Sequence, residues 1–267
     1  MDVLTTKGWN DYGLLDTGEG RRLERYGKYL ISRPDPQAIW KKSLLQSEWE
    51  KADAVFENDN WSTKQNFPPK WHISYKELKI YAKLTPFKHT GIFPEQSINW
   101  QFIETKINEQ KSMNGQPNIL NLFAYTGIAS LVAAKSGAKV THVDGSKPSI
   151  SWAKENQLLS NLSDKPIRWI LDDAITFTSR EIRRGVVYDG IIMDPPVYGH
   201  GPNGEKWDFN KDFPKLFENC SKLLSPTPLF VIANAYAISS SPIMLANIFE
   251  DFLPKGLKVA DFPLPRR

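Results

Sequence analysis

The sequence predicts an α/β fold, in which a small β-rich region precedes a doubly wound, mostly parallel sheet. Two observations carry this prediction. After about residue 97, short apolar runs alternate with helix-length stretches, the pattern of a parallel sheet covered by helices. Before about residue 90, glycines and prolines break the chain into short β-like pieces. Because 267 residues suit one large domain with an appendage, we expect a region over residues 1–90 and a domain over residues 91–267.

The first region is expected to contain short strands joined by turns. The β-like pieces are Tyr12–Asp16, Leu23–Ser32, Trp71–Ser74 and Leu78–Leu84. A turn is predicted at Asp16–Gly20, which reads Asp-Thr-Gly-Glu-Gly. The stretch Trp40–Phe56 is compatible with either a helix or a loop, so its structure is left open.

The second region alternates strands and helices. A first helix is expected over Ser97–Gln110, because a serine precedes apolar residues at helical spacing. Strands are expected at Asn118–Ala124, Lys139–Asp144, Ile167–Leu171, Tyr188–Met193 and Pro228–Asn234, and a last one at Leu257–Phe262. Helices are expected at Ile128–Ser136, Lys147–Leu159, Ala174–Arg184, Lys211–Leu224 and Ser240–Phe252. This order is typical of a Rossmann-like sheet.

Charge and cysteine content limit the classes of function. The net charge of +4 permits an anionic partner without requiring one. The single cysteine, Cys220, permits neither an internal disulfide nor a cysteine-rich metal cluster, so no metal is expected. No signal peptide is visible, and no apolar run approaches the roughly 20 residues of a membrane span. We therefore expect a cytoplasmic protein without a membrane partner.

Ligands of a doubly wound sheet lie beyond the carboxyl ends of its strands. The segment after the first strand has one glycine, Gly127, and lacks the Gly-x-Gly-x-x-Gly of a pyrophosphate cradle; it suits a ligand without phosphate, or a plain turn. Asp144 ends the second strand, where a carboxylate accepts bonds from ribose hydroxyls or serves as a solvated cap. Asp172 and Asp173 close the third strand, and Asp173 either meets an adenine amino group or caps a helix.

The fourth strand ends in Asp194-Pro195-Pro196-Val197-Tyr198-Gly199. Two prolines make the turn rigid, so the Asp194 carboxylate and the Pro195 carbonyl are expected to be fixed acceptors facing the ligand. Tyr198 then supplies a ring on which a planar base can stack. A purely structural turn is the alternative. The polar segment His200–Trp207 that follows fits a substrate lid or an ordinary surface loop.

Together these segments resemble class I S-adenosylmethionine-dependent methyltransferases, in particular those that methylate bases of large-subunit (23S) ribosomal RNA. The matching segments are Asn121–Gly127, Val143-Asp144, Asp172–Ala174 and Asp194–Gly199, with Lys88–Gln96, Leu14–Gly18 and Arg33–Ala38 upstream. The similarity spans nearly the whole chain. It implies S-adenosylmethionine as cofactor, RNA (23S ribosomal RNA or a ribosomal precursor) as partner, and a possible RNA-binding role for the β-rich region.

The resemblance also implies roles for individual residues. The cofactor is expected to contact Phe93, Gln96, Phe123, Ala124, Gly127, Asp144, Asp173 and Ala174. The methyl acceptor is expected at Asp194, Pro195 and Tyr198. Members that methylate a cytosine carbon use a cysteine after the fifth strand, where this chain reads Ile232–Tyr236 without one. Cys220 is instead expected to pack within a helix, which favours a base nitrogen as the acceptor.

Three alternatives remain open at this point. The first is methylation of a small molecule or a protein by the same cofactor. The second is a nicotinamide-dependent oxidoreductase with the same sheet, which the missing glycine pattern disfavours. The third is a non-catalytic RNA-binding homologue.

Overall fold

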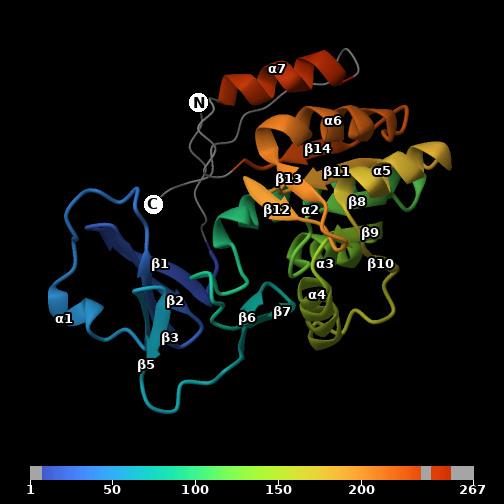
Figure 1. Cartoon of the computed structure of the whole chain (residues 1–267). Coiled ribbons are helices and arrows are strands. Elements are labelled where there is room, and N and C mark those ends of the chain that lie inside the picture. Colours follow the sequence, from blue (N-terminus) through green and yellow to red (C-terminus); the bar gives the residue numbers. More distant parts are fainter. Residues whose placement is uncertain (1–7, 236–241, 254–267) are drawn as a thin grey trace. The chain divides into compact units, whose positions relative to one another are not determined.

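The computed structural model describes residues 8–235 and 242–253 and divides the chain into two compact units (Figure 1). The division between the described parts of the units falls between Ile98 and Asn99, a few residues beyond the expected one at residues 90 and 91. The strand expected at Leu257–Phe262 lies outside the described residues.

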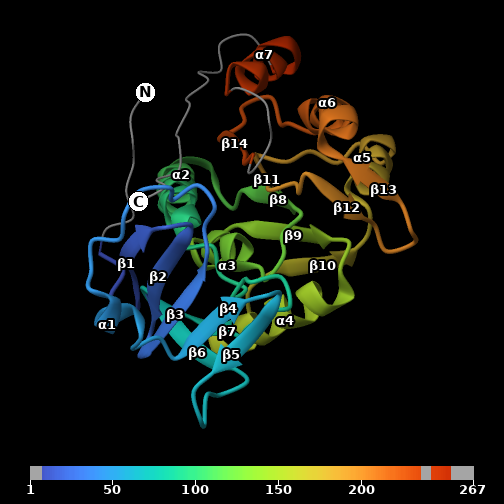
Figure 2. The same ribbon diagram turned by 60° about the vertical axis from the view of Figure 1, so that its left-hand side comes forward.

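The first unit contains a five-stranded sheet in chain order (Figure 2). Its strands are β1 (Tyr12–Gly18), β2 (Arg21–Tyr26), β3 (Tyr29–Pro34), β4 (Ala54–Glu57) and β5 (Asn60–Thr63). Neighbours are antiparallel except β3 and β4, which are parallel. The single β piece expected over Leu23–Ser32 was wrong: Gly27 adopts a φ of 65°, a left-handed conformation that glycine tolerates, and the chain turns there between β2 and β3.

The remainder of the first unit is less regular. The stretch Trp40–Phe56 is neither one helix nor one loop, because it contains the short helix α1 (Gln46–Trp49) and the start of β4. A separate hairpin follows, made of β6 (Trp71–Tyr75) and β7 (Leu78–Ala82). The described part of the unit ends with the 3-10 helix η1 (Pro94–Gln96) and the first residues of the next helix.

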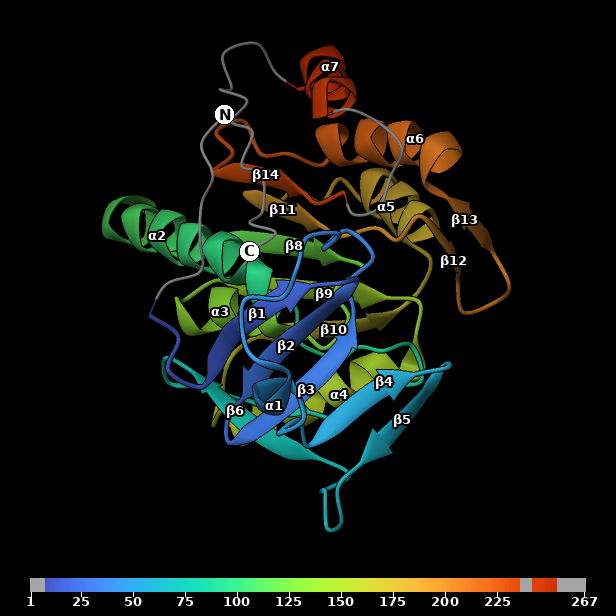
Figure 3. The ribbon, with the colours of Figure 1, turned by 90° about the vertical axis from the view of Figure 1, so that its left-hand side faces the viewer.

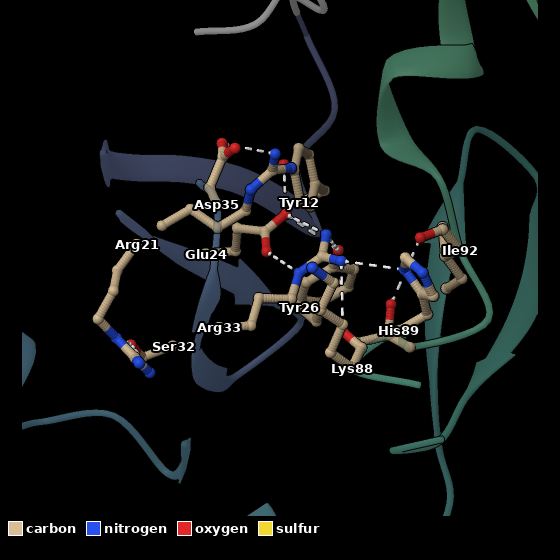
Figure 4. Close-up of polar contacts among 12 residues, drawn as sticks. Tyr12, Arg21, Glu24, Tyr26, Ser32, Arg33, Asp35, Lys88, His89 and Ile92 are labelled. Carbon is tan, nitrogen blue, oxygen red and sulfur yellow. Dashed lines mark hydrogen bonds and ion pairs between the residues drawn. The ribbon is translucent and has the colours of Figure 1, made fainter. Parts of the chain in front are cut away.

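A cluster of paired charged side chains lies inside the first unit (Figure 4). The guanidinium of Arg33 donates from Nε to Glu24 Oε2 at 2.5 Å and from Nη2 to Glu24 Oε1 at 3.0 Å. The hydroxyls of Tyr12 and Tyr26 donate to the same Oε1 at 3.0 and 3.1 Å. Burial raises the pKa of Glu24, but Arg33, together with Arg22 and the Tyr12 hydroxyl, outweighs burial and holds the pKa of the carboxyl below its ordinary value. Every polar atom of this carboxylate therefore has a partner, as a buried charge requires.

The second unit is built on a parallel sheet with the order β10-β9-β8-β11-β14 (Figure 3). Its strands are β8 (Asn118–Leu122), β9 (Lys139–Asp144), β10 (Ile167–Leu171), β11 (Gly190–Met193) and β14 (Phe230–Ala233). The helices are α2 (Ser97–Asn114), α3 (Ile128–Lys135), α4 (Lys147–Leu159), α5 (Ala174–Arg183), α6 (Phe209–Lys222) and α7 (Pro242–Phe252). The expected Rossmann-like α/β class is thereby confirmed.

Helices cover both faces of this sheet (Figure 1). Helices α3 and α4 pack together against β8 and β9, whereas α5, α6 and α7 pack in series on the other side, as right-handed crossovers require when the strand order reverses. Apolar side chains of β8 and β11 meet Phe213 and Phe217 of α6 in one buried cluster. This packing fixes the carboxyl ends of the strands, where the expected site lies.

Candidate active site

Three of the expected site residues of the second unit, Phe123, Asp144 and Asp194, lie in a row at the carboxyl edge of the sheet. Register pairs Leu122 with both Val143 and Met193, and Met193 with Ala233. The next residue of each strand is therefore Asp144, Phe123, Asp194 or Asn234, and these follow one another across neighbouring strands. The row crosses the junction of β8 and β11, where the strand order reverses. This is the position at which doubly wound sheets bind ligands.

The turn after β8 has a backbone that few sequences adopt. Phe123 and Tyr125 have φ values of 53° and 48°, and Gly127 has 82°. Left-handed non-glycine residues are uncommon and are concentrated at functional sites. At Gly127 a Cβ would come within 2.8 Å of the Cβ of Ala153 on α4. Gly127 is thus required both by its φ and by the close approach of α4.

Polar side chains hold this turn in place. Asp144 Oδ2 accepts from the backbone N–H of Tyr125 at 2.8 Å, and Oδ1 accepts from that of Ser146 at 2.8 Å. Burial raises the pKa of Asp144 above its ordinary value, although both of these bonds oppose the shift. Each carboxylate oxygen has accepted one hydrogen bond and has capacity for another. The carboxylate is thus suited to accept bonds from ligand hydroxyls.

A residue that sequence reasoning missed, Asn156, also supports the turn. It is fully buried on α4, and its Nδ2 donates to the carbonyl oxygen of Thr126 at 2.9 Å. The only signal for Asn156 in the sequence was an amide side chain within an expected helix, because no motif surrounds it.

The third-strand aspartates have structural partners. Asp173 caps α5, since its Oδ1 accepts from the backbone N–H of Thr176 at 2.8 Å, so the capping alternative is realised. Asp172 accepts from Arg180 and from the backbone N–H of Asp173. Ala174 is the first residue of α5, where a helix leaves backbone N–H groups without an intrahelical acceptor. Adenine contacts at Asp173 and Ala174 stay a prediction.

The diproline segment is tied to the residues that follow it. The carbonyl oxygen of Pro196 accepts from Trp207 Nε1 at 2.7 Å, and that of Val197 accepts from the N–H of Phe209 at 2.9 Å. Pro195 is buried, Asp194 is half-buried, and Tyr198 is 71% exposed. The roles predicted for these last three residues therefore remain predictions, with the Tyr198 ring accessible for stacking.

The segment after the diproline turn is not an irregular loop. Strand β12 (Tyr198–His200) pairs with β13 (Lys206–Asp208) in an antiparallel hairpin, which we call the edge hairpin. A signal for it existed, because Pro202-Asn203-Gly204 is a turn sequence. The Trp207 ring lies 4.9 Å from that of Phe123, and a Cβ on Gly145 would lie 3.3 Å from the His200 carbonyl oxygen. The edge hairpin thus runs from β11 past β8 to the end of β9 (Figure 3).

Two expected cofactor residues, Phe93 and Gln96, belong to the first unit. The Phe93 ring lies 5.1 Å from that of His89, and Gln96 is a buried residue of η1. Their contact with a cofactor stays a prediction.

Cys220 packs inside the second unit, as expected. It is 1% exposed, its Sγ lies 3.7 Å from Met193 Sδ, and burial raises the pKa of its thiol. At the carboxyl edge the corresponding row position on β14 is Asn234, whose Oδ1 accepts from Asn99 Nδ2 at 2.9 Å. Among the described residues, no group of three or more histidine, cysteine or acidic side chains is arranged to hold a metal ion.

Comparison with known proteins gives relatives of two kinds. No family model matches the sequence. The ribosomal RNA large subunit methyltransferase K/L of Pseudoalteromonas atlantica is 30% identical over 190 residues, which cover 67% of this chain and 26% of that protein. The protein of the same name from Shewanella oneidensis is 35% identical over 190 residues, with shares of 67% and 25%. The chain spans about a quarter of the length of these relatives.

Solved structures match over nearly the whole chain. A SAM-dependent methyltransferase from Agrobacterium tumefaciens is 39% identical, has a TM-score of 0.91, and is matched over 94% of this chain and 81% of its own. The methyltransferase SMU.776, complexed with SAH, is 21% identical with a TM-score of 0.74, over 99% of this chain and 71% of its own. The second likeness concerns the fold alone.

Proposed function

We propose that this chain, which belongs to the S-adenosylmethionine-dependent methyltransferases, binds S-adenosylmethionine at the carboxyl edge of its parallel sheet and methylates a base nitrogen in large-subunit ribosomal RNA. The observation that carries the proposal is the row Asp144, Phe123 and Asp194 across the strand reversal. It brings a half-buried carboxylate, a strained turn and the diproline segment to one edge.

The residues present fit this cofactor. It contains ribose hydroxyls, for which the Asp144 carboxylate has acceptor capacity. It carries a positive sulfonium and no phosphate, so a turn with Gly127 alone, and without a glycine-rich cradle, is sufficient. In this proposal Phe123 and Ala124 line the ribose and methionine part, and the adenine lies at the start of α5.

S-adenosylmethionine supplies the methyl group from its sulfonium. The chain's own contribution is then mainly to hold the acceptor in line with that methyl. The Asp194 carboxylate and the Pro195 carbonyl hold the acceptor through its N–H groups, while the Tyr198 ring stacks on the base. Attack by a pyrimidine carbon needs a cysteine nucleophile, and the single cysteine of the sequence is buried in α6. A nitrogen, whose lone pair needs no covalent activation, is therefore the proposed acceptor.

Ribosomal RNA as the substrate is supported by the names of the relatives in Pseudoalteromonas and Shewanella. The net charge of +4 is compatible with a polyanion. The target base is held unstacked so that its nitrogen reaches the site, and the β-rich region over residues 1–90 contributes to holding the RNA. Since the relatives are named for ribosomal RNA, we propose a cytoplasmic site of action. In the described part of the chain, no helix is both long and apolar enough to span a membrane.

The test begins with isothermal titration of the purified chain with S-adenosylmethionine, with NAD as the comparison. We expect binding of S-adenosylmethionine alone. Transfer of a radiolabelled methyl group to unmodified 23S ribosomal RNA is then measured, and mass spectrometry of the nucleosides identifies the methylated atom. Binding of NAD alone would overturn the proposal that S-adenosylmethionine is the cofactor. A label found only on protein or small molecules would overturn the substrate, and a label on carbon would overturn the acceptor chemistry.

A further inference from the structure

We infer that the outward face of the edge hairpin binds single-stranded RNA beside the methylated base, a conclusion that rests on the proposed function. The register of the hairpin pairs Tyr198 with Asp208, Gly199 with Trp207, and His200 with Lys206. Side chains alternate between the two faces of a strand. Gly199 and Trp207 therefore occupy one face, and Tyr198, His200 and Lys206 share the other with Asp208.

The two faces differ sharply in exposure. Trp207 is 6% exposed, whereas Tyr198 is 71% exposed, and His200 and Lys206 are also exposed. Single-stranded RNA is recognised by stacking of its bases on aromatic rings, histidine included, together with cationic contacts to its phosphates. Tyr198 and His200 are two residues apart, about 7 Å along the strand, and Lys206 lies opposite His200. The outward face thus combines two rings with one ammonium group.

The carboxylates of the hairpin are committed to other contacts. Asp208 caps α6, because its Oδ1 accepts from the N–H of Asn210 at 3.1 Å, and its Oδ2 lies 3.5 Å from Lys211 Nζ. Glu205 accepts at the hairpin tip from the backbone N–H of Asn203 at 2.9 Å and from its Nδ2 at 3.1 Å. Neither carboxylate is paired with Lys206, which is exposed, so in this proposal its ammonium group contacts an RNA phosphate.

The hairpin is also fixed before any ligand arrives. Trp207 donates to the Pro196 carbonyl and contacts Phe123, and the tip packs on Gly145. A preformed surface of this kind loses less conformational freedom on binding than a mobile loop does. Tyr198 also belongs to the proposed acceptor site. The RNA strand that leads away from the target base therefore continues along His200 and Lys206.

The experiment measures binding of the whole 267-residue chain to a fluorescently labelled, mixed-sequence single-stranded RNA at several salt concentrations. We expect Lys206→Gln to weaken binding about fivefold at 0.1 M salt and to reduce the slope of log affinity against log salt by about 0.7, the value for one phosphate contact on a single strand. His200→Ala is expected to weaken binding at least about fivefold through lost stacking. Lys206→Arg, which keeps the charge, should bind as the original chain does.

The matched control is Lys222→Gln, which removes the same charge from α6, where Lys222 pairs with Glu218 at 2.7 Å. We expect no change in RNA binding from it. Wild-type affinity and salt slope in both Lys206→Gln and His200→Ala would overturn the inference while leaving the proposed function intact if these variants still methylate ribosomal RNA. Equal binding of an RNA duplex and the single strand would overturn it as well. A wild-type chain that binds S-adenosylmethionine but neither binds nor methylates RNA would overturn the proposed substrate together with the inference.

Discussion

The two units surround a carboxylate that is withdrawn from water in opposite ways. In the first unit Glu24 is enclosed with Arg33, which keeps the pKa of the carboxyl low. In the second unit Asp144 is half-buried, its carboxylate accepts from the backbone N–H groups of Tyr125 and Ser146, and burial raises its pKa. A buried ion without a counter-ion is costly to the fold, and such groups concentrate where ligands bind. The comparison separates a carboxylate that stabilises the fold from one that we propose to bind the cofactor.

The largest expected effect comes from breaking the Glu24–Arg33 pair. Arg33→Met should destabilise the first unit by about 3–5 kcal/mol, because it leaves a buried carboxylate without its cation. Chemical denaturation followed by tryptophan fluorescence measures this. The control is Lys51→Met, which removes an exposed partner of Glu48 and should cost less than about 1 kcal/mol. Equal effects of the two substitutions would show that burial does not distinguish the pairs.

Asp144→Asn should lower the affinity for the cofactor. We expect S-adenosylmethionine to bind about 10- to 150-fold more weakly, which corresponds to about 1.5–3 kcal/mol for hydrogen bonds to a charged group. Isothermal titration provides the measurement, with the exposed Asp164→Asn as the control. An affinity equal to that of the original chain would remove Asp144 from the cofactor site.

Removing the indole N–H of Trp207 should have a smaller effect than the two substitutions above. Trp207→Phe deletes the donor to the Pro196 carbonyl and should lower stability by about 0.5–1.5 kcal/mol. If the hairpin positions the acceptor, KM for RNA should rise while S-adenosylmethionine affinity stays constant. Phe209→Leu, a change in the α6 core, serves as the comparison for stability alone. A rise in the dissociation constant for S-adenosylmethionine equal to the rise in KM would contradict this division of roles.

The pH dependence of stability gives the finest test of the comparison, because the pKa values of the two carboxylates are shifted in opposite directions. The lowered pKa of Glu24 contributes stability that is present above the unfolded-state pKa and is lost as pH falls through the folded-state value. The raised pKa of Asp144 means that the folded state holds its proton longer, so stability declines as pH rises from the unfolded-state pKa through the raised one. The free energy of unfolding of the original chain is compared with that of each variant across pH. The difference from Glu24→Gln should grow as pH rises, whereas the difference from Asp144→Asn should decline as pH rises. Parallel curves would refute the contrast.

The sequence predicted the second unit better than the first. Four of the five strands of the parallel sheet end at or just before a polar residue, whereas β8 is followed by Phe123. Both the strands and the candidate residues at their ends could therefore be located. Asp144 and Asp194 were found in this way. In the first unit Leu23–Ser32 carries a strand-like pattern across a two-residue turn at Gly27, and nothing in its polarity divides β2 from β3.

What escaped prediction depends on contacts between distant positions. Asn156 acts on a carbonyl 30 residues away, and the strands of the edge hairpin are three residues each, too short for a period to emerge. The pairing of Glu24 with Arg33 was equally hidden, because an acidic and a basic residue nine positions apart look the same whether they are exposed or buried.

The row of residues at the sheet edge also fixes a distance between backbones. Neighbouring strands lie about 4.8 Å apart, and Asp144 and Asp194 are separated by one intervening strand, β8. Their backbones are thus held roughly 10 Å apart by the hydrogen-bond spacing of the sheet, a separation that side-chain substitutions cannot readily alter. The hydrogen-bond spacing of the sheet thus fixes the distance between the two backbones whose side chains we propose to hold the cofactor and the acceptor.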